Sequence, residues 1–196
     1  MRLLSAIFCL STSIAISQPL VHQEPHHIPV FQNSHVRVMD VSAQAGDTTQ
    51  FHIHKNDIAY FTIQGSSMWL QELGGEPRNV TLPTGWSGSD LTHSKTPLIH
   101  RFANVGDVKF QLIAVEVLSD RFAKKVFTKT ELNHHESARF SIGELTDKAF
   151  VSEVPCILIQ LSESGHVTIL DYLKPGKQLP VLSGANSTRV VIIQFK

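Results

Sequence analysis

The stretch GDTTQFHIH, residues 46–54, carries two histidines one residue apart. Side chains alternate between the two faces of a β-strand, so His52 and His54 share one face while Ile53 points to the other. Two imidazoles that project together can bind one metal ion at about 2.0–2.1 Å per bond. A third histidine, His100, lies in a second strand-like run, and it completes such a site only if the fold brings the two runs side by side.

Strand patterns of this kind dominate the chain. Alternating or apolar runs occur at residues 36–41, 58–64, 68–72, 98–102, 110–118, 157–161, 167–172 and 189–195. Glycine-containing turn signals separate these runs, and long helical stretches are scarce. Short strands at close spacing predict an all-β sandwich or barrel.

The two histidine segments resemble the two motifs of the cupin family. The first family motif is Gly, five residues, His-x-His, three or four residues, Glu, six residues, Gly; the second ends in His, three residues, Asn. The chain matches the first with Gly46, His52, His54 and Gly65, and the second with His100 and Asn104. The resemblance covers about residues 30–118 and implies a double-stranded β-helix, the jelly-roll barrel of the cupins.

The resemblance also implies a ligand set. Cupins bind one divalent metal inside the barrel through the two motif-one histidines, the glutamate and the motif-two histidine, which implies His52, His54 and His100 here. Positions 58 and 59, where the glutamate belongs, are apolar. Asp57 is the nearest carboxylate and a candidate ligand, although a continuous strand places it on the face opposite His54. Histidines with carboxylate or water suit iron, manganese, nickel, copper or zinc, and the sequence does not choose among them.

The other histidines give weaker signals. His26 and His27 are adjacent, and a solvated N-terminal segment explains them about as well as a function does. His93 is expected in a loop at the barrel mouth, where a surface position is favoured over a contact to the site. His134 and His135 fall in a polar connector and are interpreted as solvated.

The pattern predicts four segments: a signal peptide (1–17), a cupin barrel (18–118), a connector (119–137) and a shorter, degenerate cupin-like β segment (138–196). The last segment has about sixty residues and some five strands, fewer than the roughly eight that close a small barrel. It contains no His-x-His. We therefore expect it to pair with the first sheet or pack upon it rather than stand alone.

The N-terminus has the three parts of a secretory signal. Met1-Arg2 is followed by an apolar stretch over residues 3–16 and by a small-x-small site ending at Ser17, before Gln18. We expect a secreted or periplasmic protein with no stable membrane span after cleavage. Cleavage would leave Cys156 as the single cysteine, so no internal disulfide is expected.

Composition bears on the partners. Lys+Arg and Asp+Glu are both 17, and no basic run offers a surface for phosphates, so nucleic acid is not expected as a partner. A small-molecule ligand or substrate is expected instead. The edges of the sheets make a homodimer plausible.

Two classes of function stay open. The first is a metalloenzyme, in which the ion polarises a substrate oxygen or activates water or dioxygen; the cupin resemblance implies oxygenase, isomerase or decarboxylase chemistry. The second is a non-catalytic, metal-free barrel that binds a small ligand such as a sugar. The missing glutamate favours the second class, and the three histidines favour the first.

Overall fold

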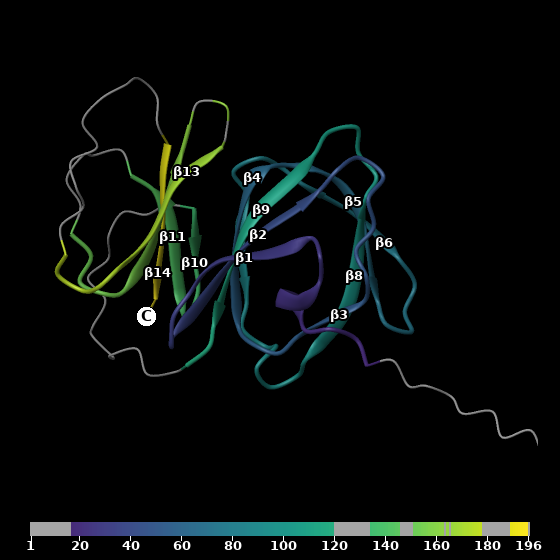
Figure 1. The fold of residues 1–196 in the computed structure, drawn as a ribbon, viewed down its shortest axis with the longest axis horizontal. Coiled ribbons are helices and arrows are strands. Elements are labelled where there is room, and N and C mark those ends of the chain that lie inside the picture. The colour runs from purple at the N-terminus through teal and green to yellow at the C-terminus, as the bar shows by residue number, and fades with distance from the viewer. Residues whose placement is uncertain are drawn as a thin grey trace, which may run out of the picture.

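The computed structural model describes residues 17–119, 134–145, 151–162, 164, 166–177 and 189–195, which are nearly all β (Figure 1). Residues 1–16 of the expected signal peptide and 120–133 of the expected connector lie outside these ranges. One short 3-10 turn, η1 (Val21–Gln23), precedes the first strand. Within the described ranges no helix has both the length and the apolar character needed to cross a membrane.

Two antiparallel sheets form the first half of the molecule and face each other (Figure 1). The five-stranded sheet has the order β1 (His27–Gln32), β2 (Val36–Ala43), β9 (Phe110–Val117), β4 (Ile58–Gln64) and β7 (Ser87–Asp90). The four-stranded sheet has the order β3 (His52–His54), β8 (Leu98–Asn104), β5 (Ser66–Glu72) and β6 (Arg78–Leu82). From β2 to β9 the chain crosses repeatedly from one sheet to the other, and this winding is a double-stranded β-helix.

Two glycines make this winding possible. Gly46, in the turn between β2 and β3, has φ +88°, a conformation that side-chain-bearing residues rarely adopt. At Gly65, between β4 and β5, a Cβ atom would lie 2.3 Å from the carbonyl oxygen of Leu82. No side chain fits there without moving the backbone. The two glycines of the first motif are therefore required by the fold.

Asn104, the last residue of the second motif, ties the two sheets together. Its side chain is fully buried and donates from Nδ2 to the carbonyl oxygens of Ala43, at 3.0 Å, and Val108, at 2.8 Å. Its Oδ1 accepts from the hydroxyl of Ser66 at 2.7 Å. One amide thus joins the end of β2, the start of β5 and the turn after β8. A buried polar group whose hydrogen bonds are all made holds these elements in one arrangement.

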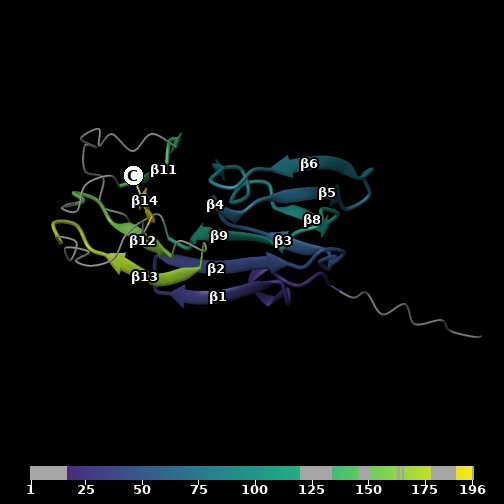
Figure 2. The same cartoon turned by 90° about the horizontal axis from the view of Figure 1, so that it is seen from above.

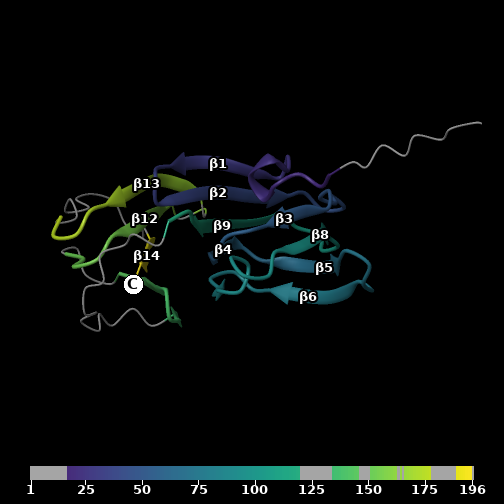
Figure 3. The same ribbon diagram turned by 90° about the horizontal axis from the view of Figure 1, so that it is seen from below.

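A third antiparallel sheet contains the second half of the chain. Its order is β10 (His135–Glu136), β11 (Phe140–Glu144), β14 (Arg189–Phe195), β12 (Cys156–Leu161) and β13 (Val167–Leu173). In Figure 1 this sheet stands beside β4, β9 and β2, on the side away from β5, β6 and β8. Figures 2 and 3 show the same arrangement from above and below.

One apolar core joins this sheet to the barrel. It combines residues from the outer face of the five-stranded sheet, among them Val38, Phe61 and Val115, with Phe140, Ile159 and other residues of the C-terminal sheet. An ion pair and an aromatic contact add to it: Asp57 pairs with Arg139 at 3.1 Å, and the ring of Phe31 stacks on that of Tyr172 with centroids 6.1 Å apart. The described part of the C-terminal segment packs upon the first sheet and contributes no strand to the barrel.

Candidate metal centre

The pairing of β3 with β8 brings three of the predicted ligands together. In the antiparallel register His52 lies directly opposite His100, and His54 lies opposite Leu98. The Nε2 atoms of His54 and His100 are 2.9 Å apart, and the ring centroids of His52 and His100 are 4.7 Å apart. The two nitrogens of a ligand pair at neighbouring positions of one metal lie about 2.8–3.4 Å apart, given metal–nitrogen bonds of about 2.0–2.1 Å. The pair His54 and His100 already has this spacing.

His27 is a further member of the group, although the sequence left its role open. It begins β1 in the other sheet, it is buried, and its ring centroid lies 4.4 Å from that of His52. One ligand nitrogen from each of His27, His52 and His54 lies within 4.8 Å of the others. Small side-chain movements would bring these three nitrogens to the spacing of a metal site.

Hydrogen bonds fix which ring nitrogen faces the centre. The Nδ1 of His52 is 2.9 Å from the carbonyl oxygen of Gln50, and the Nδ1 of His27 is 2.6 Å from Glu24 Oε2. Both acceptors lack a proton, so each Nδ1 must donate, and in each ring Nε2 is the nitrogen left to face the centre. The Nε2 of His52 is buried and has no hydrogen-bond partner among the described residues. This is the arrangement in which histidines bind metals, with the second nitrogen held by a carbonyl or carboxylate.

Glu24 is a buried carboxylate that the sequence did not point to. Its oxygens accept from His27 Nδ1, from the backbone and ring of His26, and from the amide of Gln50. Burial alone would raise the pKa of Glu24, but the hydrogen bonds from His27 and His26 outweigh it and lower the pKa to about 2. A charged carboxylate therefore stands behind His27, although none occupies position 58 or 59.

The central histidines are neutral at physiological pH. Burial, together with the positive charge of neighbouring groups, lowers the pKa of His52 to about 4 and that of His100 to about 3. Burial, with His100 nearby, also lowers the pKa of His54 well below its usual range. Neutral imidazole is the form that offers a lone pair to a metal.

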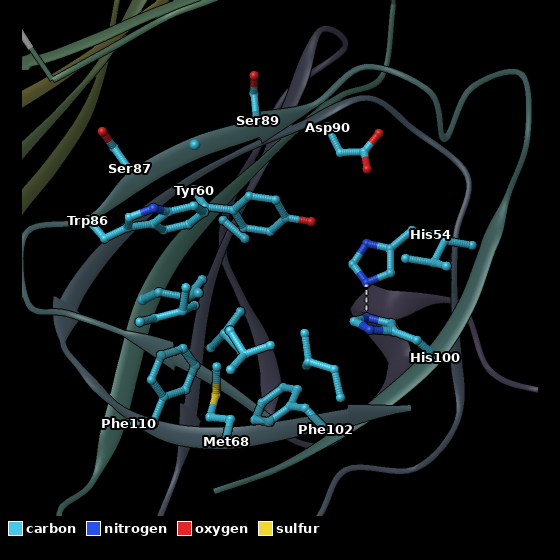
Figure 4. A pocket seen from close by; sticks show the side chains of 18 of the residues that line it. His54, Tyr60, Met68, Trp86, Ser87, Ser89, Asp90, His100, Phe102 and Phe110 are labelled. Carbon is cyan, nitrogen blue, oxygen red and sulfur yellow. Dashed lines mark hydrogen bonds between the residues drawn. The ribbon is translucent and has the colours of Figure 1, made fainter. Parts of the chain in front are cut away.

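A cavity of about 590 Å³ opens from these histidines into the barrel. His27, His54, His93 and His100 line it, together with apolar side chains from both sheets. Figure 4 shows His54 and His100 facing each other at one side of this space. Its volume lies within the range of small-molecule sites, roughly 300–1,000 Å³.

Asp57 does not join the histidines. Its buried carboxylate pairs with Arg139 at 3.1 Å and accepts from the backbone amide of Ser94 at 3.2 Å. It is not in the described cluster of possible metal ligands, which contains His27, His52 and His54. β3 ends at His54 and β4 begins at Ile58, so Asp57 lies in the connection between them, where its carboxylate faces Arg139 and Ser94. The carboxylate links the barrel to the C-terminal sheet instead.

Two histidines that the sequence placed in solvent lie at the cavity. His93 is only 3% exposed, its ring centroid is 5.2 Å from that of His54, and its Nε2 is 3.2 Å from Asp90 Oδ2. His135, from the C-terminal sheet, lines the cavity and shares a 2.9 Å hydrogen bond with Ser89. The interpretation of His93 as a surface residue was wrong, because contacts between distant segments bury its side chain, while His135 is half-buried. His134 is exposed, as expected.

The strand order, the glycine turns and the two histidine segments together define a cupin-type double-stranded β-helix, with an added β-sheet. No protein-family model matches the sequence, and no curated protein matches it significantly.

Solved structures that resemble the chain include cupins at low identity. A cupin domain from Bordetella pertussis is 20% identical over 53% of this chain and 99% of its own, with a TM-score of 0.42. An RmlC-like cupin with a double-stranded β-helix from Methanocaldococcus jannaschii is 14% identical over 46% of this chain and 77% of its own, with a TM-score of 0.38. A cupin-superfamily sugar phosphate isomerase from Silicibacter pomeroyi is 17% identical over 44% of this chain and 52% of its own, with a TM-score of 0.34.

The buried neutral histidines predict a loss of stability in acid for the metal-free protein. The pKa values of His52 and His100 are lowered in the folded state, so their contribution is complete above the unfolded value of 6.5. It is lost as the pH falls from about 6.5 toward 4 and 3, because the unfolded chain then binds protons that the folded chain does not. Each histidine contributes a slope of at most about 1.4 kcal/mol per pH unit.

Urea unfolding with a chelator present, between about pH 7 and pH 4.5, measures this slope. His100→Asn should lower the slope of unfolding free energy against pH by up to about 1.4 kcal/mol per pH unit, the contribution of one proton. His134→Asn, at an exposed position, should leave the slope unchanged. A wild-type stability that stays constant or rises as the pH falls would contradict the prediction.

Proposed function

We propose that this chain is an exported, metal-dependent cupin that acts on a small molecule. His27, His52 and His54 hold one divalent transition metal, with His100 beside them as a fourth nitrogen donor. The observation that carries the proposal is the Nε2 of His52. It is buried and has no partner among the described residues, while Nδ1 of the same ring is bonded to the Gln50 carbonyl. An orphaned, pre-oriented lone pair is costly to bury unless it binds something.

The donor set fits a particular group of metals. Three or four neutral imidazole nitrogens suit iron, manganese, nickel, copper or zinc, whereas calcium and magnesium prefer oxygen ligands. Glu24 supplies negative charge one hydrogen bond away from the centre, through His27. This charge raises the basicity of the His27 ring and so strengthens its bond to a cation.

When bound, such a metal polarises a substrate oxygen or activates water or dioxygen. The chain's own residues then have separate tasks. The imidazoles bind and orient, Glu24 holds the proton at Nδ1 of His27, and the apolar walls of the cavity exclude bulk water. The cupin resemblance implies oxygenase, isomerase or decarboxylase chemistry, and the donor set is compatible with each.

A metal-free, ligand-binding barrel is the second candidate, and two observations favour it. Ile58 and Ala59, fully buried, stand where cupins place the glutamate. The 2.9 Å contact between His54 and His100 can also be a direct hydrogen bond, with one ring donating to the other. The two candidates differ in whether the purified protein holds a metal.

Metal content decides between them. The full-length protein, produced in a secreting host and purified without a histidine tag, should contain about one equivalent of transition metal by elemental analysis. The variant His52→Ala/His54→Ala should contain less than about a tenth of an equivalent, because two of the ligands are gone. His134→Ala removes an exposed histidine and should keep the metal. A wild-type content below a tenth of an equivalent, unchanged by the mutations, supports the metal-free barrel.

Glu24→Gln tests the carboxylate behind His27. The change keeps the shape of the side chain and removes its charge, so metal affinity should fall by about tenfold or more, the usual effect of losing such a partner. Competition with a chromophoric chelator measures the affinity. Glu76→Gln, at an exposed position, is the matched control. Equal metal affinities in the two variants would show that Glu24 does not contribute to metal binding. A thermal melt checks that both variants are folded.

The proposal that the protein is exported rests on the sequence of residues 1–17. In a secreting host, the exported protein should begin at Gln18 by N-terminal sequencing, since the small-x-small site ends at Ser17. A protein that still begins at Met1 would contradict cleavage.

A further inference from the structure

The cavity has two chemically different ends. The histidines occupy one, and the hydroxyl of Tyr60 points toward that side (Figure 4). The floor is apolar, with Phe102 beside His27 and with Met68 and Phe110 farther from His54, while Ser87, Ser89 and Asp90 of β7 lie along one wall (Figure 4). Aliphatic residues of β6 and β9, including Leu82 and Leu112, continue this lining.

Trp86 forms part of the apolar end, and Gly88 fixes its position. A Cβ atom at Gly88 would lie 2.5 Å from Cη2 and 2.7 Å from Cζ2 of the indole. The ring thus lies directly against the glycine, and any side chain there would displace it. Trp86 is 37% exposed, a high value for a large aromatic residue. A partly exposed indole on the wall of a cavity is a surface on which a flat, apolar ligand can pack.

A sugar fits the apolar floor of this cavity poorly. Each ring hydroxyl that faces Met68, Phe102 or Leu82 would lose its hydrogen bonds to water and gain none, at about 1–3 kcal/mol per group. An apolar body would instead be stabilised by about 25 cal/mol for each Å² removed from water. At the other end, a divalent cation held by neutral imidazoles carries net positive charge, which favours an anionic oxygen.

We infer that the ligand of this cavity is a small carboxylate with an apolar, aromatic-sized body, its carboxylate at the histidine end and its body against Trp86, Phe102 and Phe110. The inference rests on the proposed function for the head group. The apolar body is inferred from the cavity wall and does not depend on a bound metal.

Three probes distinguish the contribution of the carboxylate from that of the apolar body. The first is 3-phenylpropionate, which has both. The second, 3-phenylpropan-1-ol, has the same body and no charge, and the third, D-glucuronate, has the same charge and a polyhydroxylated body. Trp86 is the reporter, because the chain has two tryptophans and Trp69 does not line the cavity. The full-length protein with Trp69→Phe, loaded with zinc, is titrated with each probe while indole fluorescence is recorded.

We expect 3-phenylpropionate to bind at least about thirtyfold more tightly than D-glucuronate and about tenfold more tightly than the alcohol. Gly88→Ala, which displaces the indole, and Leu82→Gln, which places an amide in the wall, should each weaken 3-phenylpropionate by about tenfold. The zinc stoichiometry should stay unchanged. Leu73→Gln, at an exposed leucine, is the matched control and should bind like the parent. Thermal melts identify a variant that fails to fold, in which case the other one carries the test.

The other outcomes overturn the inference in distinguishable ways. If zinc binds but D-glucuronate binds as tightly as 3-phenylpropionate, the ligand class is wrong and the proposed metal site stands. If zinc binds and no probe changes the fluorescence up to about 10 mM, the ligand class is also wrong. If zinc does not bind, the proposed function fails and the carboxylate position fails with it. The alcohol then tests the wall alone, and its failure to bind overturns the apolar body as well.

Discussion

The hydrogen-bonded pairing of β3 with β8 is the contact on which the site depends. β3 has only three residues, so few ladder hydrogen bonds hold it, yet a shift by one residue would turn His52 and His54 out of the barrel. Neighbouring contacts fix this register. The backbone amide of Thr49 donates to the carbonyl of Phe102 at 2.9 Å, and the Thr49 hydroxyl accepts from the amide of Phe102 at 2.9 Å. On the other edge of β3, the amide of Ile53 donates to the carbonyl of Pro19 at 2.9 Å.

The segment that follows the expected cleavage site therefore takes part in building the centre. Residues 19 and 20 run beside β3, and Glu24 and His27 come from the next turn and strand. Glu24 also accepts from the amide of Gln50, so the same carboxylate orients His27 and anchors the residues that lead into β3. The position of the N-terminal segment and the geometry of the histidines are thus set together.

Local periodicity predicted most of the strands and the shared face of His52 and His54. Asp57 lies away from the histidines because β3 ends at His54, and the connection to β4 places its carboxylate against Arg139. Strand β7 was missed, because its sequence SGSD has little intrinsic preference for strands and becomes one by pairing with β4. His27 and His93 were missed for a similar reason, since each reaches the cavity through contacts between segments far apart in the chain. In hindsight, the Glu24-x-x-His27 spacing was the one local signal for His27.

The C-terminal sheet covers a face that a bare barrel would leave to solvent or to another subunit. Its core with β2, β4 and β9 is an interface within one polypeptide. A subunit interface forms in proportion to protein concentration, whereas a tethered one forms at a fixed effective concentration. The barrel of this chain therefore keeps that face covered even at high dilution, without help from a second copy of the protein.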